Sequence, residues 1–288
     1  MVIPALNSAE TIGYTLSSIF SNKFKPDGFE VIVVDNGSSD NTENIVKRFP
    51  ARLYFCEKRG MCAALNLGIK NAKGDIICIT VSDCIVPDDW LEKISEFFGA
   101  HPDVEGVGGP VLSPLNGFKN NIQRFTAELW VEDQKFPTKV IETQNMAMYA
   151  GGLIAAANCA YRRETVISQG FFDESVEWGE VDFCWKLVKK GKRLMFNPEI
   201  ETVHLGSPWT IRGVFRQQFK WGKAFAEILK KHSSFNIVDD LKRETWFSRQ
   251  LVKAFLLLLS PSRESKTKQL VRLCHYLSFH LGLIYGRS

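Results

Sequence analysis

The chain of 288 residues is 45% hydrophobic, 24% charged and 12% aromatic, which is typical of a globular protein. Because this apolar fraction buries enough surface to offset chain entropy, a disordered or fibrous protein is excluded. The net charge of +4 is too small to indicate a nucleic-acid partner, and we expect none. The charge is uneven: residues 241–288 carry nine Lys or Arg and two Glu, or +7, which leaves −3 for residues 1–240.

The seven cysteines are scattered and include no C-x-x-C pair. A disulfide framework or a zinc site needs paired spacing, so we expect reduced thiols in a cytoplasmic protein. Met1 is followed by no pattern of a secretory signal, and no apolar run approaches the ~20 residues of a membrane span.

Residues 1–81 alternate between short apolar runs and segments of helical spacing. Strands are predicted at 2–3, 31–34, 53–55 and 76–81. Helices are predicted at 12–20, after a capping signal at 7–10, around 45–46, and at 63–72. This alternation predicts an α/β fold with a doubly wound, mostly parallel sheet. The β-branched run 31–34 is typical of a strand buried on both faces.

Residues 104–205 are less regular. Strands are predicted at 104–111, 155–161, 194–197 and 201–204, and helices at 121–132, 163–169 and 179–190. Three glycines at 106, 108 and 109 could form a phosphate loop or allow close backbone packing. Because the G-x-G-x-x-G pattern and a following helix are lacking, we favour close packing. From about residue 207 the pattern becomes helical and basic.

Two aspartates stand where predicted strands end, Asp35 after 31–34 and Asp83 after 76–81. Ligands of open α/β sheets bind at the carboxyl ends of the strands. Asp35 suits a hydrogen bond to a base or ribose, and Asp83 suits a divalent cation that neutralises a diphosphate. The alternative for each is a cap on the following helix.

Seven motifs in a fixed order resemble the landmarks of family 2 glycosyltransferases with the GT-A fold. They are residues 2–7 (VIPALN), 33–40 (VVDNGSSD), 63–69 (AALNLGI), 82–91 (SDCIVPDDWL), 158–163 (NCAYRR), 170–174 (GFFDE) and 179–185 (GEVDFCW). The resemblance implies a Rossmann-like GT-A domain over residues 1–205 and a helical, basic extension over 206–288. It also implies transfer of a sugar, with inversion, from a nucleotide-diphosphate sugar during cell-surface polysaccharide biosynthesis.

The same resemblance assigns donor and metal roles. It implies that six residues contact the nucleotide sugar: Pro4, Asn7 and Asp35 at the nucleoside, Gly60 and Asn66 beside the sugar and diphosphate, and Asp83. The implied cofactor is a divalent metal, Mg²⁺ or Mn²⁺, held by Asp83 and His204. A single histidine of this kind is otherwise a structural residue.

A sugar hydroxyl has a pKa far above 7, so the attacking acceptor needs a carboxylate base. The resemblance places that base at Glu180 and assigns Asp182, two residues further on, to the catalytic residues as well. The alternative is that both are acids stabilised by the positive end of a helix dipole.

The chain departs from the family pattern at three places. Val81 replaces the first Asp of the D-x-D motif, Gly179-Glu180 replaces the usual acidic pair, and Lys220 replaces Arg in a Q-x-x-R-W element with Gln217 and Trp221. In relatives that element contacts the acceptor sugar and the diphosphate. These departures motivate an alternative function, a nucleotide-sugar-binding pseudoenzyme or partner subunit. A dehydrogenase is disfavoured by the lack of a dinucleotide fingerprint.

The basic tail contains two apolar stretches, 251–259 and 270–284, flanked by Lys and Arg. Such a pattern suits a helix that lies on an anionic membrane. We therefore expect peripheral attachment at the inner face of the cell membrane and a glycan or lipid-linked acceptor. The alternative is a solvated helical subdomain that caps the active site.

Overall fold

The computed structural model of the protein describes residues 1–24, 28–114, 116–133, 136–142, 155–232, 252 and 266–287. The chain divides into two compact units. Unit 1 comprises Met1–Leu112 and Phe136–Gly206, and unit 2 comprises Ser113–Lys135 and Ser207–Ser288. The functional division into residues 1–205 and 206–288 stays a prediction.

The first half of unit 1 alternates strands and helices as the sequence predicts. The elements are β1 (Val2–Ala5), α1 (Ile12–Phe20), β2 (Ile32–Asp35), α2 (Thr42–Val46), β3 (Arg52–Phe55), α3 (Met61–Asn71) and β4 (Ile76–Ile79). The predicted capping signal at 7–10 is wrong, because α1 begins after Thr11 and has no side-chain cap. The Asn7 and Ser8 side chains bond elsewhere, Asn7 to Ser39 and Ser8 to Ser82.

The second half of unit 1 contains shorter strands. The elements are β5 (Cys84–Ile85), α4 (Trp90–Ala100), β6 (Val104–Gly108), β7 (Val111–Leu112), β8 (Ile141–Glu142), β9 (Cys159–Arg162), α6 (Arg163–Ser168), α7 (Gly179–Lys189), β10 (Arg193–Phe196) and β11 (Thr202–His204). The strand predicted over 104–111 is two strands in different sheets. Gly109 lies at the break, where a Cβ would collide with the Ile200 carbonyl group, so close backbone packing explains this glycine.

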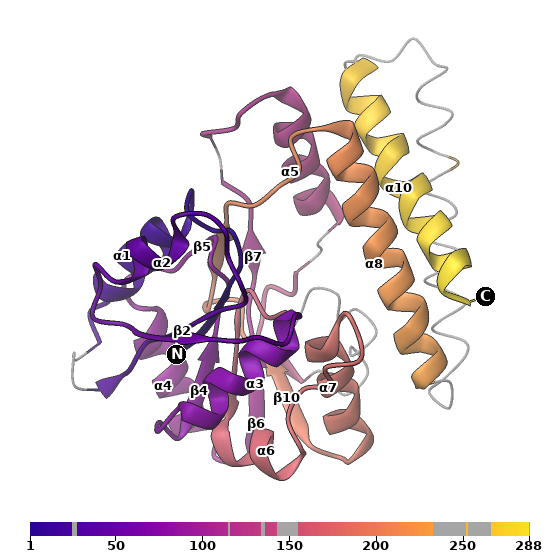
Figure 1. Ribbon diagram of the computed structural model, residues 1–288. Helices are drawn as coiled ribbons and strands as arrows, with labels where there is room; N and C mark the ends of the chain where they lie inside the picture. Colours follow the sequence, from indigo (N-terminus) through magenta and orange to yellow (C-terminus); the bar gives the residue numbers. More distant parts are fainter. Residues whose placement is uncertain are drawn as a thin grey trace. The chain divides into compact units, whose positions relative to one another are not determined.

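Within the described residues, eight strands form one sheet in the order β3-β2-β1-β4-β9-β6-β10-β8 (Figure 1). Strands β3, β2, β1 and β4 run parallel to one another, and β9 is antiparallel to both β4 and β6. A second sheet has the order β5-β11-β7. The parallel strands bring the loops after β1, β2 and β4 to one edge of the sheet.

The main sheet is covered on both faces, as the continuous apolar run of β2 predicts. One face packs against α3 and α7 through a cluster that includes Leu65 and Phe183. The other packs against α1 and α4 through a cluster that includes Leu16 and Trp90. All seven cysteines are free thiols, as predicted.

Unit 2 contains three described helices, α5 (Asn121–Asp133), α8 (Ile211–Lys231) and α10 (Lys266–Arg287). Thr210 is the N-cap of α8, and its hydroxyl group accepts a hydrogen bond from the Gly213 amide at 3.0 Å. In the parts of the chain that the structure covers, no helix is both long and apolar enough to cross a membrane. Apart from residue 252, the apolar stretch predicted at 251–259 lies outside the described residues.

Candidate active site

Asp35 ends β2 at the edge where the parallel strands terminate, and it is 3% exposed. Its Oδ1 accepts hydrogen bonds from the amide and the hydroxyl group of Ser38, at 2.8 and 2.7 Å. Asp35 therefore anchors the turn that precedes α2 and is not that helix's N-cap, which is Asn41.

Two residues of the preceding strand and its loop lie beside this turn. Pro4 is buried in β1, where it is paired with Val34 of β2. Asn7 adopts a left-handed backbone, with φ of 50°, and its Oδ1 accepts from the Ser39 amide at 2.8 Å. The structure thus brings Asn7 and Asp35 to the same short turn.

Gly60 ends the loop after β3, as the N-cap of α3, with φ of 128°, a backbone region in which glycine is favoured. Its amide donates to Asn36 Oδ1 at 2.8 Å, and the Asn36 amide group donates to the Lys58 carbonyl group at 2.7 Å. The Arg59 guanidinium donates to the Asn36 carbonyl group at 2.7 Å. Sequence reasoning missed Asn36 and Arg59, although the N-G pair at 36–37 marks a turn that needs such anchoring.

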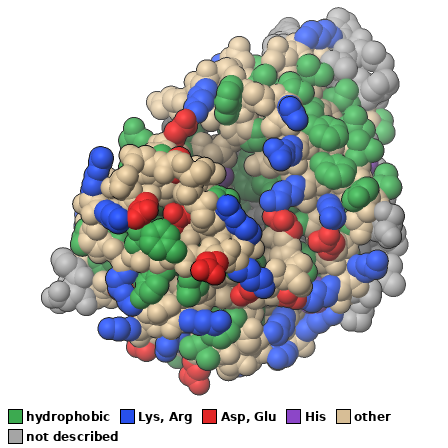
Figure 2. All heavy atoms as spheres, viewed as in Figure 1, with side chains coloured by type: hydrophobic (Ala, Val, Ile, Leu, Met, Phe, Trp, Pro, Cys, Tyr) green, Lys and Arg blue, Asp and Glu red, His purple; other side chains and the backbone are tan. Residues whose placement is uncertain are grey.

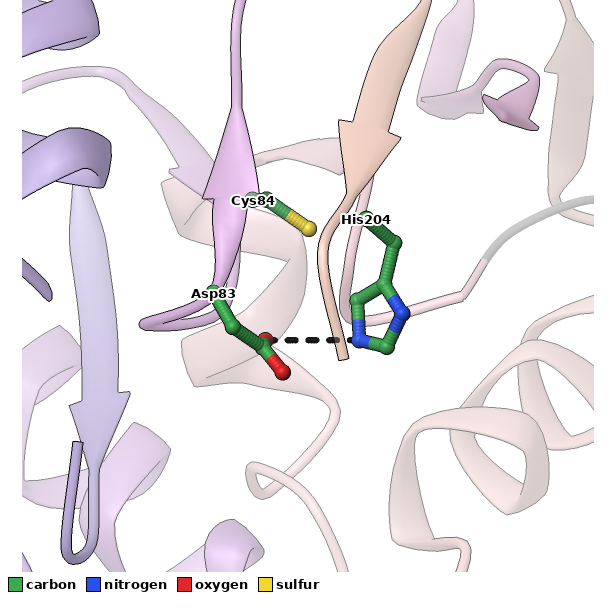
Figure 3. A group of neighbouring side chains, drawn as sticks. All are labelled: Asp83, Cys84 and His204. Atoms are coloured by element: carbon green, nitrogen blue, oxygen red, sulfur yellow. Dashed lines mark ion pairs between the residues drawn. The ribbon is translucent and has the colours of Figure 1, made fainter. Parts of the chain in front are cut away.

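Asp83, Cys84 and His204 form a cluster where the two strands β5 and β11 pair (Figure 3). Cys84 lies opposite His204 in the antiparallel register. One ligand atom from each side chain lies within 4.8 Å of the other two. The His204 Nε2 atom lies 3.3 Å from Asp83 Oδ1.

The cluster is positioned by contacts distant in sequence. Asp83 is fixed at its backbone, because the Leu205 amide donates to its carbonyl group at 2.8 Å. Its carboxylate lies so close to Gly206 that a Cβ there would collide with Oδ2. The buried side-chain amide group of Asn158 donates to the Pro110 and Ile200 carbonyl groups at 2.9 and 2.6 Å, next to the strands β7 and β11.

The electrostatics of Asp83 and His204 are mutually dependent. Burial disfavours the charge on Asp83, yet the nearby His204 lowers the pKa of the carboxyl group overall. Burial likewise disfavours the charged imidazole, and Asp83 nevertheless raises the pKa of His204. A carboxylate, an imidazole and a neighbouring thiol are a donor set that fits a divalent transition-metal ion, so these residues are suited to hold one.

Glu180 and Asp182 lie in the first turn of α7 and are 7% and 3% exposed. Within the described structure, the Glu180 Oε2 atom is buried without a hydrogen-bond partner. Burial raises the pKa of Glu180 to about 7, and the charge of Glu177 adds to the effect. The position is tightly packed, because a Cβ on Gly179 would collide with Cys62 Sγ.

Asn66 lies in α3 and is 3% exposed. Its amide group donates to the Phe172 carbonyl group at 2.9 Å and to Glu174 Oε1 at 2.8 Å, and its Oδ1 accepts from the Phe172 amide at 3.1 Å. Lys58 pairs with the other oxygen of Glu174 at 2.6 Å. Asn66 therefore fixes the turn that leads into α7 and Glu180.

The remaining predicted residues lie on α8 in unit 2. Gln217 and Trp221 are half-buried and Lys220 is exposed. The Trp221 ring packs against Trp130 of α5, with centroids 5.6 Å apart. Unit 2 thus holds Trp221 in an aromatic pair of its own.

The fold and this edge of polar loops define an α/β protein of the GT-A class. A model of glycosyl transferase family 2 matches residues 1–167. The chain therefore belongs to glycosyl transferase family 2, as its seven motifs predict.

The chain is similar to curated relatives over 79% of its length. It is 26% identical over 234 residues to poly-beta-1,6-N-acetyl-D-glucosamine synthase of Staphylococcus aureus (strain COL), of which it covers 54%. It is 25% identical over 236 residues to glycosyltransferase AglE of Haloferax volcanii, of which it covers 73%. The chain thus spans about half the length of the first of these relatives.

Among solved structures, the chain is similar to the mannosyltransferase PcManGT from Pyrobaculum calidifontis in complex with GDP-Man and Mn²⁺. The TM-score is 0.66 at 18% identity, and the alignment covers all of this chain and 87% of that one. The predicted GT-A fold class is confirmed by this likeness.

Proposed function

We propose that the protein is an inverting glycosyltransferase. It moves a sugar from a nucleotide-diphosphate sugar to a glycan or lipid-linked acceptor by direct displacement. Membership of glycosyl transferase family 2 supports the reaction class. The similarity to a poly-beta-1,6-N-acetyl-D-glucosamine synthase supports a glycan acceptor, and the similarity to glycosyltransferase AglE supports the reaction class.

The observation that carries the proposal is the buried carboxyl oxygen of Glu180, which has no hydrogen-bond partner among the described residues. An acid at a helix N-terminus is normally stabilised as the charged form by the helix dipole. Here burial overrides that effect and raises the pKa to about 7. A carboxylate poised near neutral pH is suited to accept a proton from a hydroxyl group during the reaction.

In the proposed reaction the acceptor oxygen attacks the anomeric carbon while the bond from that carbon to the diphosphate breaks. The hydroxyl proton passes to Glu180, and the nucleoside diphosphate leaves with the bonding electrons. Attack opposite to the leaving group inverts the anomeric centre. Asp182, buried one half-turn further along α7, is proposed to hold the first turn of the helix in place.

The donor is proposed to bind at the edge formed by the loops after β1, β2 and β3. Asp35 and Asn7 would contact the nucleoside, with Pro4 behind them, and Gly60 would lie beside the sugar and diphosphate. Their shared turn and the strained backbone at Asn7 support this placement, because such geometry is often found at ligand sites. Asn66 is proposed to act by positioning the turn before α7.

A divalent metal is proposed to be held by Asp83 and His204. When bound, it would neutralise charge on the diphosphate leaving group. The donor set and the Mn²⁺ of the similar mannosyltransferase complex support Mn²⁺ as the first ion to test. On the acceptor side, we propose that Trp221 contacts the acceptor, and Lys220 and Gln217 the diphosphate.

The test compares Glu180→Gln with the matched variant Glu177→Gln, which removes an exposed carboxylate one turn earlier. Sugar transfer is measured with UDP- and GDP-linked sugars, Mn²⁺ and a panel of glycan and lipid-linked acceptors. We expect a loss of about 10²- to 10⁴-fold for Glu180→Gln and little change for Glu177→Gln. Nucleotide binding, measured by thermal shift, should survive in both.

Two outcomes would overturn the proposal. If wild type binds nucleotide but is as inactive as Glu180→Gln on every acceptor, the protein is a binding subunit. If Glu180→Gln transfers sugar at the wild-type rate, another group is the base.

A further inference from the structure

Helices α8 and α10 of unit 2 pack so closely that their inward faces are fixed. A Cβ on Gly222 of α8 would collide with the Phe279 carbonyl group, and one on Gly282 of α10 would collide with the Phe219 carbonyl group. Glycine at these positions lets the two backbones approach each other. The side of α10 opposite Gly282 therefore faces away from α8.

The outward side of α10 is apolar. Four residues form one stripe along the helix and are 41 to 66% exposed: Leu270, Leu277, Leu281 and Ile284. Their spacing of seven, four and three residues places them on one face. The buried side of the helix instead includes four polar residues that are at most 8% exposed: Gln269, Arg272, His275 and Ser278. Apolar residues such as Val271 and Phe279 are buried beside these polar ones, so the unusual feature of α10 is the apolar stripe on its exposed side.

A column of positive charge lies on the exposed side of α8. Arg212, Arg216 and Lys223 are exposed and lie on one face at helical spacing. The column lies close to the end of the apolar stripe. The ring of Tyr285, the residue after Ile284, lies 5.8 Å from the Lys223 Nζ atom. In Figure 2 hydrophobic side chains gather over α8 and α10 with Lys and Arg among them.

The charge around the stripe favours one kind of binding partner over another. The two helices together carry ten Lys or Arg and a single Glu, Glu227. A second copy of the same face would bring like charges together, which disfavours self-association. An anionic lipid bilayer complements both the apolar stripe, through its acyl chains, and the basic residues, through its headgroups.

We propose that the stripe Leu270–Leu277–Leu281–Ile284 of α10 inserts into the interfacial region of an anionic lipid bilayer, with the basic column of α8 over the headgroups. Helix α10 then lies in the plane of the membrane. This proposal is linked to the proposed function at one point only: a protein that lies on a membrane favours a lipid-linked acceptor over a free glycan. Binding to lipid needs neither donor nor acceptor, so it is tested separately from catalysis.

The experiment measures sedimentation of the full chain with sucrose-loaded vesicles. One set is phosphatidylcholine alone, and the other contains phosphatidylglycerol as well. Wild type should bind the anionic vesicles, and added salt should weaken the binding. Leu277→Glu and Leu281→Glu should each reduce the partition coefficient about tenfold or more, because a charge replaces an inserted side chain.

The matched control is Tyr14→Glu, which places the same charge on an exposed aromatic residue of α1 in unit 1 and should bind like wild type. Arg212→Gln and Arg216→Gln should each weaken binding about fivefold on anionic vesicles and change little on neutral ones. Because these four α-helical positions of unit 2 are exposed, thermal unfolding without vesicles should be unchanged.

Glu180→Gln should bind vesicles as wild type does, which separates this proposal from the catalytic one. The proposal is overturned if wild type does not bind anionic vesicles, or if Leu277→Glu and Tyr14→Glu bind equally. It is also overturned if size-exclusion chromatography without lipid shows a dimer that Leu277→Glu dissociates, since a second copy would then cover the stripe.

Discussion

Glu180 in unit 1 and the outward stripe of α10 in unit 2 are opposite exceptions to the same rule of burial. Among the residues that the structure describes, one oxygen of the buried Glu180 carboxyl group has no hydrogen-bond partner. The α10 stripe is a row of large aliphatic side chains left 41 to 66% exposed. Each arrangement costs free energy in the isolated protein, the first by removing a charge from water and the second by leaving apolar area in it.

The two exceptions differ in size, and this difference indicates how large a binding partner each region is suited to contact. A single buried oxygen with a pKa near 7 is suited to one proton on one small group. A stripe that extends over four turns of α10 is suited to an extended surface. We therefore propose that Glu180 of unit 1 takes part in the chemistry and that the α10 stripe of unit 2 takes part in attachment.

The largest stability effect that sharpens this comparison is expected at Glu180. The pKa of its carboxyl group is about 7 when folded and is expected near the ordinary 4.5 when unfolded. Between these values the folded state keeps a proton that the unfolded state has lost, so the free energy of unfolding falls as pH rises. Above pH 7 the loss is complete and is on the order of 3 kcal/mol.

Glu180→Gln removes this dependence. At pH 8 the variant should be more stable than wild type by about 3 kcal/mol, and near pH 4 the two should be equal. Urea unfolding at the two pH values measures the difference. Leu277→Glu provides the contrast, because an exposed substitution in α10 should change stability by less than about 0.5 kcal/mol at either pH. A Glu180→Gln variant that is no more stable at pH 8 would contradict the assigned environment.

The second expected effect concerns the rate of transfer as a function of pH. If Glu180 must be ionised to accept the proton, kcat/KM should rise about tenfold per pH unit below 7 and level off above it. Removing the negative charge of Glu177, which adds to the effect of burial, should shift this midpoint to lower pH. The comparison of wild type with Glu177→Gln across pH 5 to 9 tests both statements. Vesicle binding should show no midpoint near pH 7. If vesicle binding and kcat/KM changed with the same midpoint, one titrating group would control both, which would contradict the comparison.

The sequence predicted most strands and helices of unit 1, although not α4, β5 or β8, because apolar periodicity is encoded locally. Apolar runs ended at Asp35 and near Asp83, and the structure places Asp35 at the sheet edge as expected. It did not predict the contacts of Asn158, which lies 68 residues from Trp90 and 42 from Ile200 and bonds to both. Nor could residue spacing show that Gly206 lies against the Asp83 carboxylate. Such contacts depend on tertiary packing, which periodicity does not encode.

The same limit applied to α10. Its apolar residues were visible in the sequence as the stretch 270–284, but they also include Val271, Phe279 and Leu283, which are buried. Only the packing of Gly222 and Gly282 determines which apolar residues face α8 and which face outward. The sequence therefore predicted an apolar basic helix, and the structure identifies its exposed face.

The smallest expected effect is the change in Mn²⁺ affinity on substitution of Gly206, which lies directly against the Asp83 carboxylate. A methyl group in Gly206→Ala would displace the Asp83 carboxylate and disturb its pairing with His204. We expect Mn²⁺ affinity, measured by electron paramagnetic resonance without donor or acceptor, to fall about tenfold. Gly99→Ala is the matched control, because a Cβ there meets nothing within 4 Å. Equal Mn²⁺ affinity in the two variants would contradict the role of Asp83 as a ligand. Vesicle binding should be unchanged in both, since the stripe and the metal pair belong to separate units.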